Sequence, residues 1–457
     1  MRLPLRVVTD GATAALIAGL LGLPLIGFRL VDQSGGEGLI TRWPELGLAV
    51  ALVFAGRAAL SLIAGGAVRA ALLIMAGFAA AAAFIPWPSQ FLLIAAVGGA
   101  GLISLRAILI LLGSRPVDAM KAAIMPAGRF VPWALIVFAV LLPLLPFANR
   151  GVLDTGVMIL TYVLLGWGLN IVTGLAGLLD LGYAAFFAIG AYTAAILGSS
   201  FGLSFWACLP LAAVFASTAG ILLGFPVLRL RGDYFAIVTL GFGEIIRIVA
   251  NNWRSLTNGS QGLAGAPRPS FFGLAEFTAN PAPGHTAFNT LVGIPYNPIQ
   301  RIVFLYYLIL AAALLVNIFT LRIRRLPIGR AWEALREDEI AAQALGIDRR
   351  LVKLTAFAIG AAWGGVGGAF FAARQGFVSP ESFGFMESVA VTAIVVLGGL
   401  GSQLGVVFAA VLYVGLSELF RPLEEYRMLV FGAAMIAIMR FRPRGLIATR
   451  RPTAVLK

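Results

Sequence analysis

Long apolar segments recur along the whole chain and constrain its fold more than any other feature. Of 457 residues, 60% are hydrophobic and only 12% are charged, whereas about a quarter of the residues in ordinary soluble domains are charged. Apolar runs of roughly 18 or more residues can cross about 30 Å of hydrocarbon as helices. A bilayer offers no water to backbone amides, and the alternating pattern of a membrane barrel is absent. We therefore expect an all-α polytopic membrane protein with roughly 12–14 transmembrane or re-entrant helices.

The apolar runs predict fourteen spans. Two glycine-rich stretches, 170–185 and 385–405, are candidates for broken or re-entrant helices, because glycine tolerates irregular backbone conformations. The predicted spans are 12–28, 46–64, 70–85, 91–112, 131–148, 154–172, 183–199, 205–227, 234–251, 302–320, 352–373, 387–402, 404–420 and 426–440.

The distribution of basic residues predicts the orientation of these spans. With the N-terminus inside the cell, 24 of the 34 Lys and Arg residues fall in cytoplasmic segments or at span ends, in agreement with the positive-inside rule. An even number of crossings then places both termini in the cytoplasm. This bias accounts for the net charge of +14. Because the basic residues lie between apolar spans rather than along one face, we do not expect nucleic-acid binding.

The rarest residue types exclude several kinds of chemistry. Cys208 is the only cysteine and His285 the only histidine, so the chain has no intrachain disulfide and no histidine cluster for a metal. A single histidine also argues against a histidine-based catalytic centre. The sequence contains no Gly-x-x-x-x-Gly-Lys-Ser/Thr motif for nucleotide phosphates, so any ATP is hydrolysed by another chain. We expect neither an enzyme nor a bound cofactor.

Two segments between spans are too polar to cross a membrane. Asn252–Gln300, rich in Pro, Gly and Asn, is expected on the external side as an ordered lid or docking loop, or as a disordered loop. In the cytoplasmic segment 322–350, Gly329–Leu345 combines helix-forming residues with an apolar side, which predicts a helix along the membrane surface. Gly346 ends this helix, since glycine suits a left-handed cap. These residues alone fit a docking element and a plain amphipathic connector equally well.

Several long strings resemble one transporter family. REDEIAAQALGI at 336–347 is similar to the ATPase-coupling loop of bacterial ABC importers, in the form found in branched-chain amino-acid permeases. The resemblance covers residues from about 154 to 440, and the extra N-terminal spans are typical of the M-type subunits of this family. The other matching strings are GLNIVTGLAGLLDLGYAAFFAIGAY at 168–192, LRLRGDYFAIVTLGFGEIIR at 228–247, VSPESF at 378–383 and VLGGLGS at 396–402.

The resemblance implies a subunit of an importer for leucine, isoleucine and valine in a bacterial inner membrane. It implies accessory helices over 1–150, a permease core over 151–441 and a basic cytoplasmic tail over 442–457. The implied partners are a homologous shorter permease, two cytoplasmic ATPases that bind ATP and magnesium, and an external solute-binding protein. Loop 252–300 is the expected surface for that binding protein.

Three alternatives stay open. Permeases for urea or short amides share most of these strings, and Asp180 and Tyr183 stand where the family often has Ser and His. An ion-coupled secondary transporter acting alone would need carboxylates within the membrane, for which Glu244 and Asp180 are the candidates. A passive channel or a membrane scaffold is the third. Accumulation driven by ATP, by an ion gradient or by neither separates these classes.

Two groups of residues are candidates for functional sites. The first group is expected to couple the chain to the ATPases and comprises Glu333, Arg336, Glu337, Glu339, Ala341, Ala342, Gln343 and Gly346. The second group is assigned to the substrate pathway and comprises Asn170, Gly177, Asp180, Tyr183, Glu244, Arg247, Gly398 and Gly399. Backbone groups freed where helices break are expected to bind the carboxylate and ammonium of the substrate.

Two further patterns concern the membrane interior. Glu244 and Arg247 share one helix face at i,i+3 spacing, which fits either a structural ion pair or a polar lining of the pathway. Gly360, Gly364 and Gly368 repeat every four residues, a pattern that lets helix backbones approach closely.

Overall fold

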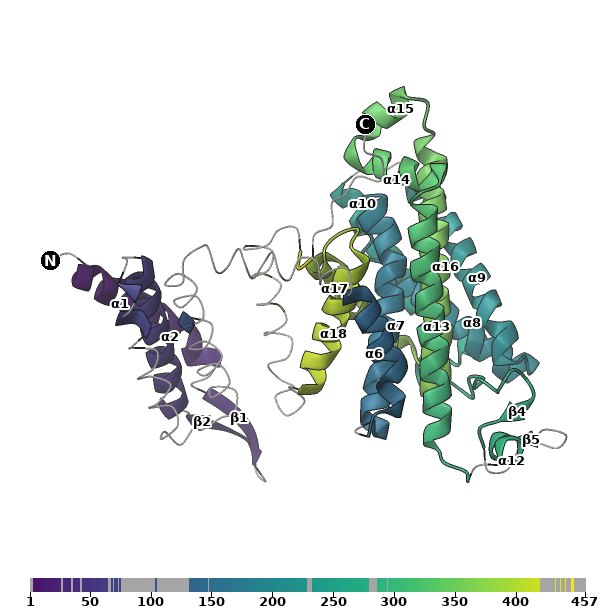
Figure 1. Cartoon of the computed structure of the whole chain (residues 1–457), viewed down its shortest axis with the longest axis horizontal. Coiled ribbons are helices and arrows are strands. Elements are labelled where there is room, and N and C mark those ends of the chain that lie inside the picture. The colour runs from purple at the N-terminus through teal and green to yellow at the C-terminus, as the bar shows by residue number, and fades with distance from the viewer. Residues whose placement is uncertain are drawn as a thin grey trace. The chain divides into compact units, whose positions relative to one another are not determined.

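The computed structural model divides the chain into two compact units, Met1–Val131 and Pro132–Lys457 (Figure 1). The predicted spans 70–85, 91–112 and 426–440 lie largely outside the residues that the structure describes. The described residues are 3–25, 28–33, 36–41, 43–64, 67, 68, 70–72, 74, 103, 104, 131–146, 148–227, 232–278, 286–293, 295–419, 432, 436, 440 and 445–447.

In the described residues of the first unit, two long helices are joined by a β-hairpin. The hairpin is antiparallel, with Phe28 opposite Thr41 and Gln33 opposite Gly36, so the chain reverses and the second helix packs along the first. The stretch Leu46–Ile63 is long and apolar enough to cross a membrane. The elements are α1 (Leu3–Leu25), β1 (Phe28–Gln33), β2 (Gly36–Thr41) and α2 (Trp43–Ala64).

The second unit is built mainly from long helices. These are α6 (Val131–Leu141), α7 (Arg150–Leu169), α8 (Ala184–Phe201), α9 (Phe205–Val227), α10 (Asp233–Asn252), α13 (Ile299–Ile323), α16 (Arg349–Gln375), α17 (Phe385–Gly398) and α18 (Gln403–Leu419). A π-helix, Asn170–Leu175, extends α7. In the described parts of the whole chain, eight helical stretches are long and apolar enough to cross a membrane, and seven of them lie in this unit.

Short elements connect these helices. β3 pairs antiparallel with β6, and β4 pairs parallel with β5. The short helices are α11 (Arg254–Thr257), α12 (Phe288–Val292), α14 (Pro327–Glu337) and α15 (Glu339–Ala344), with 3-10 turns at Leu142–Leu144, Gly259–Gln261 and Pro380–Phe383. The strands are β3 (Leu263–Ala264), β4 (Ala275–Glu276), β5 (Thr286–Ala287) and β6 (Phe377–Val378).

Consecutive long helices of this unit run in opposite directions, which gives it two distinct ends. α12, β4 and β5 lie at one end, called here the α12 end, and α14 and α15 lie at the other, called the α15 end (Figure 1). Side-chain contacts identify the helix termini at each end. Arg374 of α16 pairs with Asp154 of α7 at the α12 end, and Arg336 of α14 contacts Gly174 at the α15 end.

Glycines allow α16 to pack closely against α8 and α9. A Cβ on Gly190 of α8 would lie 2.1 Å from the carbonyl oxygen of Gly365, and a Cβ on Gly365 would lie 2.4 Å from that of Ala212 in α9. Gly368, the last residue of the predicted glycine repeat, would bring a Cβ to 2.2 Å from the carbonyl oxygen of Phe187. The prediction of close backbone packing along this helix is confirmed.

The all-α membrane fold expected from the sequence is confirmed, and eleven of the fourteen predicted spans coincide with helices. The chain is non-helical from 176 to about 183 and again over 399–402. These two stretches, called here the breaks, join helices that run in opposite directions, and a re-entrant path through the membrane stays a prediction for both. Where Asn252–Gln300 is described it contains short helices and strands, which fits an ordered loop rather than a disordered one.

Replacing Gly190 with alanine should lower the stability of the helical bundle. The new methyl group would meet the backbone of Gly365, and such overpacking typically costs about 1–3 kcal/mol. The matched control is Gly241→Ala in α10, where a Cβ meets nothing within 4 Å and alanine favours the helix. Thermal unfolding of the purified proteins in detergent, followed by intrinsic fluorescence, should show a lower Tm only for Gly190→Ala. Equal Tm values for the two variants would contradict the close crossing.

Candidate functional site

The segment between α13 and α16 forms two short helices at the α15 end, not one. The predicted single helix over Gly329–Leu345 is wrong, because the backbone of Asp338 is extended, with φ −155° and ψ 112°, and separates α14 from α15. The Asp338 carboxylate accepts hydrogen bonds from the backbone N–H groups of Ile340 and Ala341, at 2.8 and 3.0 Å. Asp338 therefore acts as the N-cap of α15 and starts a new helix.

Trp332 anchors α14 to the bundle. Its side chain is fully buried, and the indole N–H donates to the Val352 carbonyl oxygen at 3.0 Å and to the Thr355 hydroxyl at 3.2 Å, both in α16. The neighbouring Glu333 pairs with Arg324 at the end of α13, with 2.9 Å between the charged atoms. Since α14 is attached to both helices that flank it, a force applied to α14 is passed to α13 and α16.

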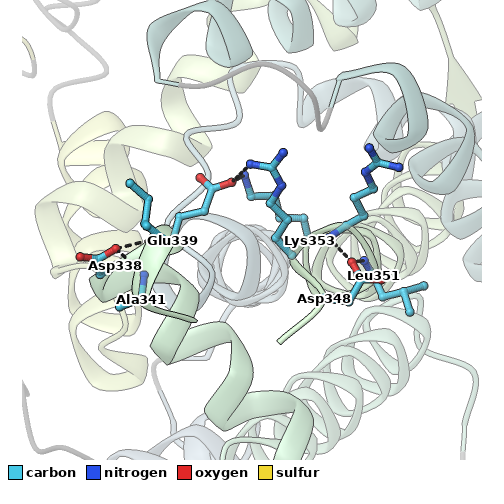
Figure 2. A network of polar contacts seen from close by, with 9 residues as sticks. Asp338, Glu339, Ala341, Asp348, Leu351 and Lys353 are labelled. Carbon is cyan, nitrogen blue, oxygen red and sulfur yellow. Dashed lines mark hydrogen bonds and ion pairs between the residues drawn. The ribbon is translucent and has the colours of Figure 1, made fainter. Parts of the chain in front are cut away.

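Ion pairs hold α15 against the start of α16 (Figure 2). The Glu339 carboxylate lies 3.0 Å from the Lys353 ammonium and 3.3 Å from the Arg349 guanidinium. The Lys353 side chain is only 5% exposed, and a buried charge requires such a partner. Asp348 caps α16 by accepting a hydrogen bond from the Arg350 N–H at 2.8 Å. α14 and α15 thus form a folded projection, called here the coupling projection (Pro327–Ala344), rather than a flexible loop.

The outer side of this projection exposes apolar side chains. Ile340 is 72% exposed and Leu345 is 81% exposed, whereas Ala342 faces inward and is buried. Gly346 has φ +83°, which confirms the left-handed cap predicted for it. Together with the exposed Glu337, Ile340 and Leu345 form a surface that is open to a protein partner.

Arg336 points from α14 into the bundle. Its guanidinium donates a hydrogen bond to the Gly174 carbonyl oxygen at the end of the π-helix. Its aliphatic stem packs against Gly177, which has φ +75°, and its guanidinium lies beside Gly401. A cation at the C-terminal end of a helix is favourable because the helix dipole is negative there. The Arg336 side chain therefore connects α14 with both breaks, 176–183 and 399–402.

Asn170 joins the same two breaks from within the bundle. It is fully buried, and its side-chain oxygen accepts a hydrogen bond of 2.8 Å from the Gly401 N–H. Gly174 leaves room for this bond, because a Cβ there would lie 1.9 Å from the Asn170 oxygen and 2.6 Å from the Gly401 nitrogen. Asn170 also begins the π-helix, an irregularity found frequently at functional sites.

The first break, residues 176–183, is held in place by side-chain and backbone hydrogen bonds. The Tyr183 hydroxyl donates to the Gly360 carbonyl oxygen of α16 at 2.9 Å. Asp180 is buried, and one of its carboxylate oxygens accepts a hydrogen bond from the Gly182 N–H at 2.8 Å. The other oxygen has no hydrogen-bond partner among the described residues. Asp180 and Tyr183 therefore lie at the break, where the sequence placed them, and both have structural contacts there.

The second break is the turn between α17 and α18. Gly398 and Gly405 pack backbone against backbone, since a Cβ on Gly405 would lie 1.9 Å from the Gly398 carbonyl oxygen. Gly399 has φ +110°, a conformation suited to glycine. The Ile447 N–H donates to the Gly398 carbonyl oxygen at 3.2 Å. The C-terminal segment thus contacts the same turn that Asn170 and Arg336 approach.

The predicted ion pair between Glu244 and Arg247 is present in α10. The Arg247 Nε–H lies 3.0 Å from each Glu244 carboxylate oxygen, and the two side chains remain 39% and 35% exposed. Charged groups within a membrane span normally face a bundle interior or a water-filled cavity. The described part of the chain covers this pair only in part, so it suits a boundary with a pathway or a second subunit.

The predicted coupling residues separate into two sets in the structure. One set is held by contacts within the chain or is buried: Glu333, Arg336, Glu339 and Ala342. The other set is exposed: Glu337, Ala341, Gln343 and Gly346. Their contact with an ATPase stays a prediction. Sequence reasoning missed Trp332 and Asp338, although a lone tryptophan in a charged segment and an aspartate before a short apolar run are recognisable signals.

Residues 151–439, which contain all of this site except Ile447, match the family described as "Branched-chain amino acid transport system / permease component". The chain is 52% identical to the high-affinity permease protein LivM of Escherichia coli over 71% of its own length and 76% of the relative's. It is 26% identical to BraD of Pseudomonas aeruginosa and 25% identical to LivH of E. coli, in each case over 63% of this chain and 91% of the relative. No solved structure matches the chain.

Replacing Asp338 with alanine should loosen α15 without unfolding the bundle. The variant loses both capping hydrogen bonds, which costs about 1 kcal/mol of local stability. Hydrogen exchange followed by mass spectrometry should show faster exchange over 340–345 and unchanged exchange in α16. Asp338→Asn, which retains a capping oxygen, is the control and should exchange as the parent does. Unchanged exchange over 340–345 in Asp338→Ala would contradict the capping role.

Proposed function

The chain belongs to the family of branched-chain amino acid transport permeases, and we propose that it is one of two permease subunits of an ATP-driven importer for leucine, isoleucine and valine. The observation that carries the proposal is the contact of Arg336 with both breaks, through Gly174 and Gly177 at the first and Gly401 at the second. The identity with LivM supports the class of substrate. The weaker similarity to LivH supports a homologous second permease as the partner.

In this proposal the α15 end is cytoplasmic and receives the ATPases. The exposed Ile340 and Leu345 enter an apolar recess of an ATPase, and Glu337 makes polar contacts at its edge. ATP and magnesium bind in the ATPases and not in this chain. When the two ATPases close, the projection moves with them, and Trp332 transfers the movement to α16.

Arg336 transfers the same movement to the breaks at 176–183 and 399–402. Segments without internal helical hydrogen bonds can change direction at less cost than intact helices, so these two breaks are the points at which the bundle opens. Freed backbone groups at 174–182 and 398–402 hold the carboxylate and ammonium of the substrate, as in other transporters with discontinuous helices. The Glu244–Arg247 face of α10 borders the pathway next to the second permease.

Transport by the purified complex in sealed proteoliposomes tests this function. With the solute-binding protein and leucine outside and ATP inside, leucine should accumulate against its gradient. Accumulation of urea or a short amide in preference to leucine would identify the alternative cargo. Accumulation driven by an ion gradient without the ATPases would identify a secondary transporter and contradict the proposal, as would equilibration alone.

Replacing Arg336 with alanine should uncouple ATP hydrolysis from uptake. The substitution removes the contact between α14 and both breaks while leaving the Trp332 anchor and the α15 tip unchanged. We expect leucine uptake to fall by about tenfold or more while at least half of the ATP hydrolysis persists, since loss of a charged hydrogen bond costs about 1.5–3 kcal/mol.

The matched control for this measurement is Arg330→Ala. Arg330 lies on the same helix and is exposed, so its removal should change uptake less than twofold if Arg336 acts through its contacts rather than its charge alone. Both quantities are measured in the same proteoliposomes. Equal uptake by the two variants would show that Arg336 does not link α14 to the transport core.

A further inference from the structure

A cavity of about 420 Å³ lies at the α12 end, opposite the coupling projection. α7, α13 and α16 meet around it, and each contributes an arginine: Arg150, Arg301 and Arg374 respectively. Val157 and Leu305 also line it. The lining therefore combines cationic and aliphatic groups.

The charges around this cavity are not balanced. Asp154 is the carboxylate that lines it, and both Asp154 oxygens are engaged by Arg374, at 3.0 and 2.6 Å. Among the described residues, Arg150 and Arg301 have no carboxylate within ion-pair distance. Arg268, whose guanidinium lies near Gly376 just after α16, is outside the lining but adds its positive charge to that of Arg150 in repelling Arg301. Four guanidinium groups against one carboxylate leave an excess of three positive charges.

This excess is unexpected at the end of the bundle that faces away from the cytoplasm. Arginine is depleted from external loops and span ends by the positive-inside rule, and clustered like charges destabilise a fold unless an anion joins them. α7 and α13 begin at this end, so the positive poles of their helix dipoles add to the field, while the negative pole of α16, which ends here, faces its own Arg374. The arrangement therefore favours an anionic group that arrives from outside the chain.

We propose that this cavity, which Arg301 and Arg150 line, receives an acidic side chain of the solute-binding protein when that protein docks on the external face. The proposal rests on the proposed function, because it requires an importer with an external binding protein. Guanidinium groups bind carboxylates with paired hydrogen bonds. The methylene groups of a glutamate or aspartate would contact Val157 and Leu305, and the recess has room for one side chain rather than for a folded segment.

Two other occupants fit the recess less well. A free zwitterionic amino acid would bring its own ammonium group into a site that already has three excess positive charges. A lipid headgroup would be expected at the lipid boundary. α7 and α16, two of the three helices around the cavity, each have 72% of their apolar window enclosed, so lipid could reach it only along α13, with 33% enclosed. An anionic side chain of a protein that covers the helix ends would neutralise the excess positive charge and could reach the cavity from its external side.

Binding measurements on the complete transporter test this docking site. The complex of this chain with the second permease and the two ATPases is placed in nanodiscs of phosphatidylcholine, which carries no net charge. Leucine-loaded solute-binding protein from the same system is the probe, and its association and dissociation are recorded by interferometry between roughly 50 and 300 mM salt, a range over which screening changes strongly.

Arg301→Gln should weaken binding by about tenfold or more at low salt, chiefly through slower association, and the difference should shrink as salt rises. Arg301→Lys keeps the charge and should retain most of the affinity. The control is Arg254→Gln. Arg254 is exposed, belongs to the segment between α10 and α13 and does not line the cavity, so this variant should change binding less than about twofold. Basal ATP hydrolysis without the binding protein should be the same in all three, which verifies that each variant is folded.

The other outcomes distinguish failure of the docking proposal from failure of the proposed function. If Arg301→Gln and Arg150→Gln bind the probe as the parent does while the parent imports leucine, the docking proposal is wrong and the proposed function stands. If the parent neither binds the probe nor imports leucine, the proposed function itself fails. The Tm of each complex is also measured with and without added phosphatidylglycerol or leucine. If the Arg301 variants bind the solute-binding protein as the parent does but are no longer stabilised by phosphatidylglycerol, the cavity is a lipid site. If they are no longer stabilised by leucine, it is a substrate site, and either result overturns the docking proposal.

Discussion

The backbone N–H and C=O groups of the two breaks, 176–183 and 399–402, need hydrogen-bond partners inside a low-dielectric bundle, and most of the distinctive contacts in this protein supply them. A bilayer supplies no water for freed N–H and C=O groups. Asn170 supplies an acceptor to the turn at Gly401, Tyr183 donates to the carbonyl of Gly360, and Arg336 supplies a cation to the end of the π-helix. Because Arg336 belongs to α14, the stability of the breaks depends on the position of the projection.

The two ends of the second unit present opposite chemistry. At the α15 end, charges are paired within the chain, as in the contacts of Glu339 with Lys353, and the exposed tip is apolar at Ile340 and Leu345. At the α12 end, Arg150 and Arg301 line a recess, and neither has a carboxylate within ion-pair distance in the part of the chain that the structure describes. An apolar tip suits a partner that stays bound, whereas unpaired charge suits one that must arrive quickly and leave again.

The sequence predicted those features that depend on composition and local pattern. Helical spans follow from apolar runs, the breaks from clustered glycine, and the close approach at Gly368 from a four-residue repeat. It did not predict the division of the projection at Asp338, since a capping aspartate and a helical surface aspartate look alike until the backbone is known. Nor did it predict that Arg336 points inward, because that direction depends on Gly174 and Gly401, which are distant in sequence. Tertiary contacts decided both.

The joint at Asp338 also bears on how such a transporter can change over time. α14 is fitted to its own bundle through Trp332 and Arg336, so substitutions there disturb many contacts at once. α15 begins anew with its own cap, and its exposed residues touch little of the chain. The exposed residues of α15 can therefore diverge along with a partner while the contacts of α14 with the bundle stay constant. For the proposed ATPase partners, a change of partner would then require changes at a few surface residues rather than in the membrane domain.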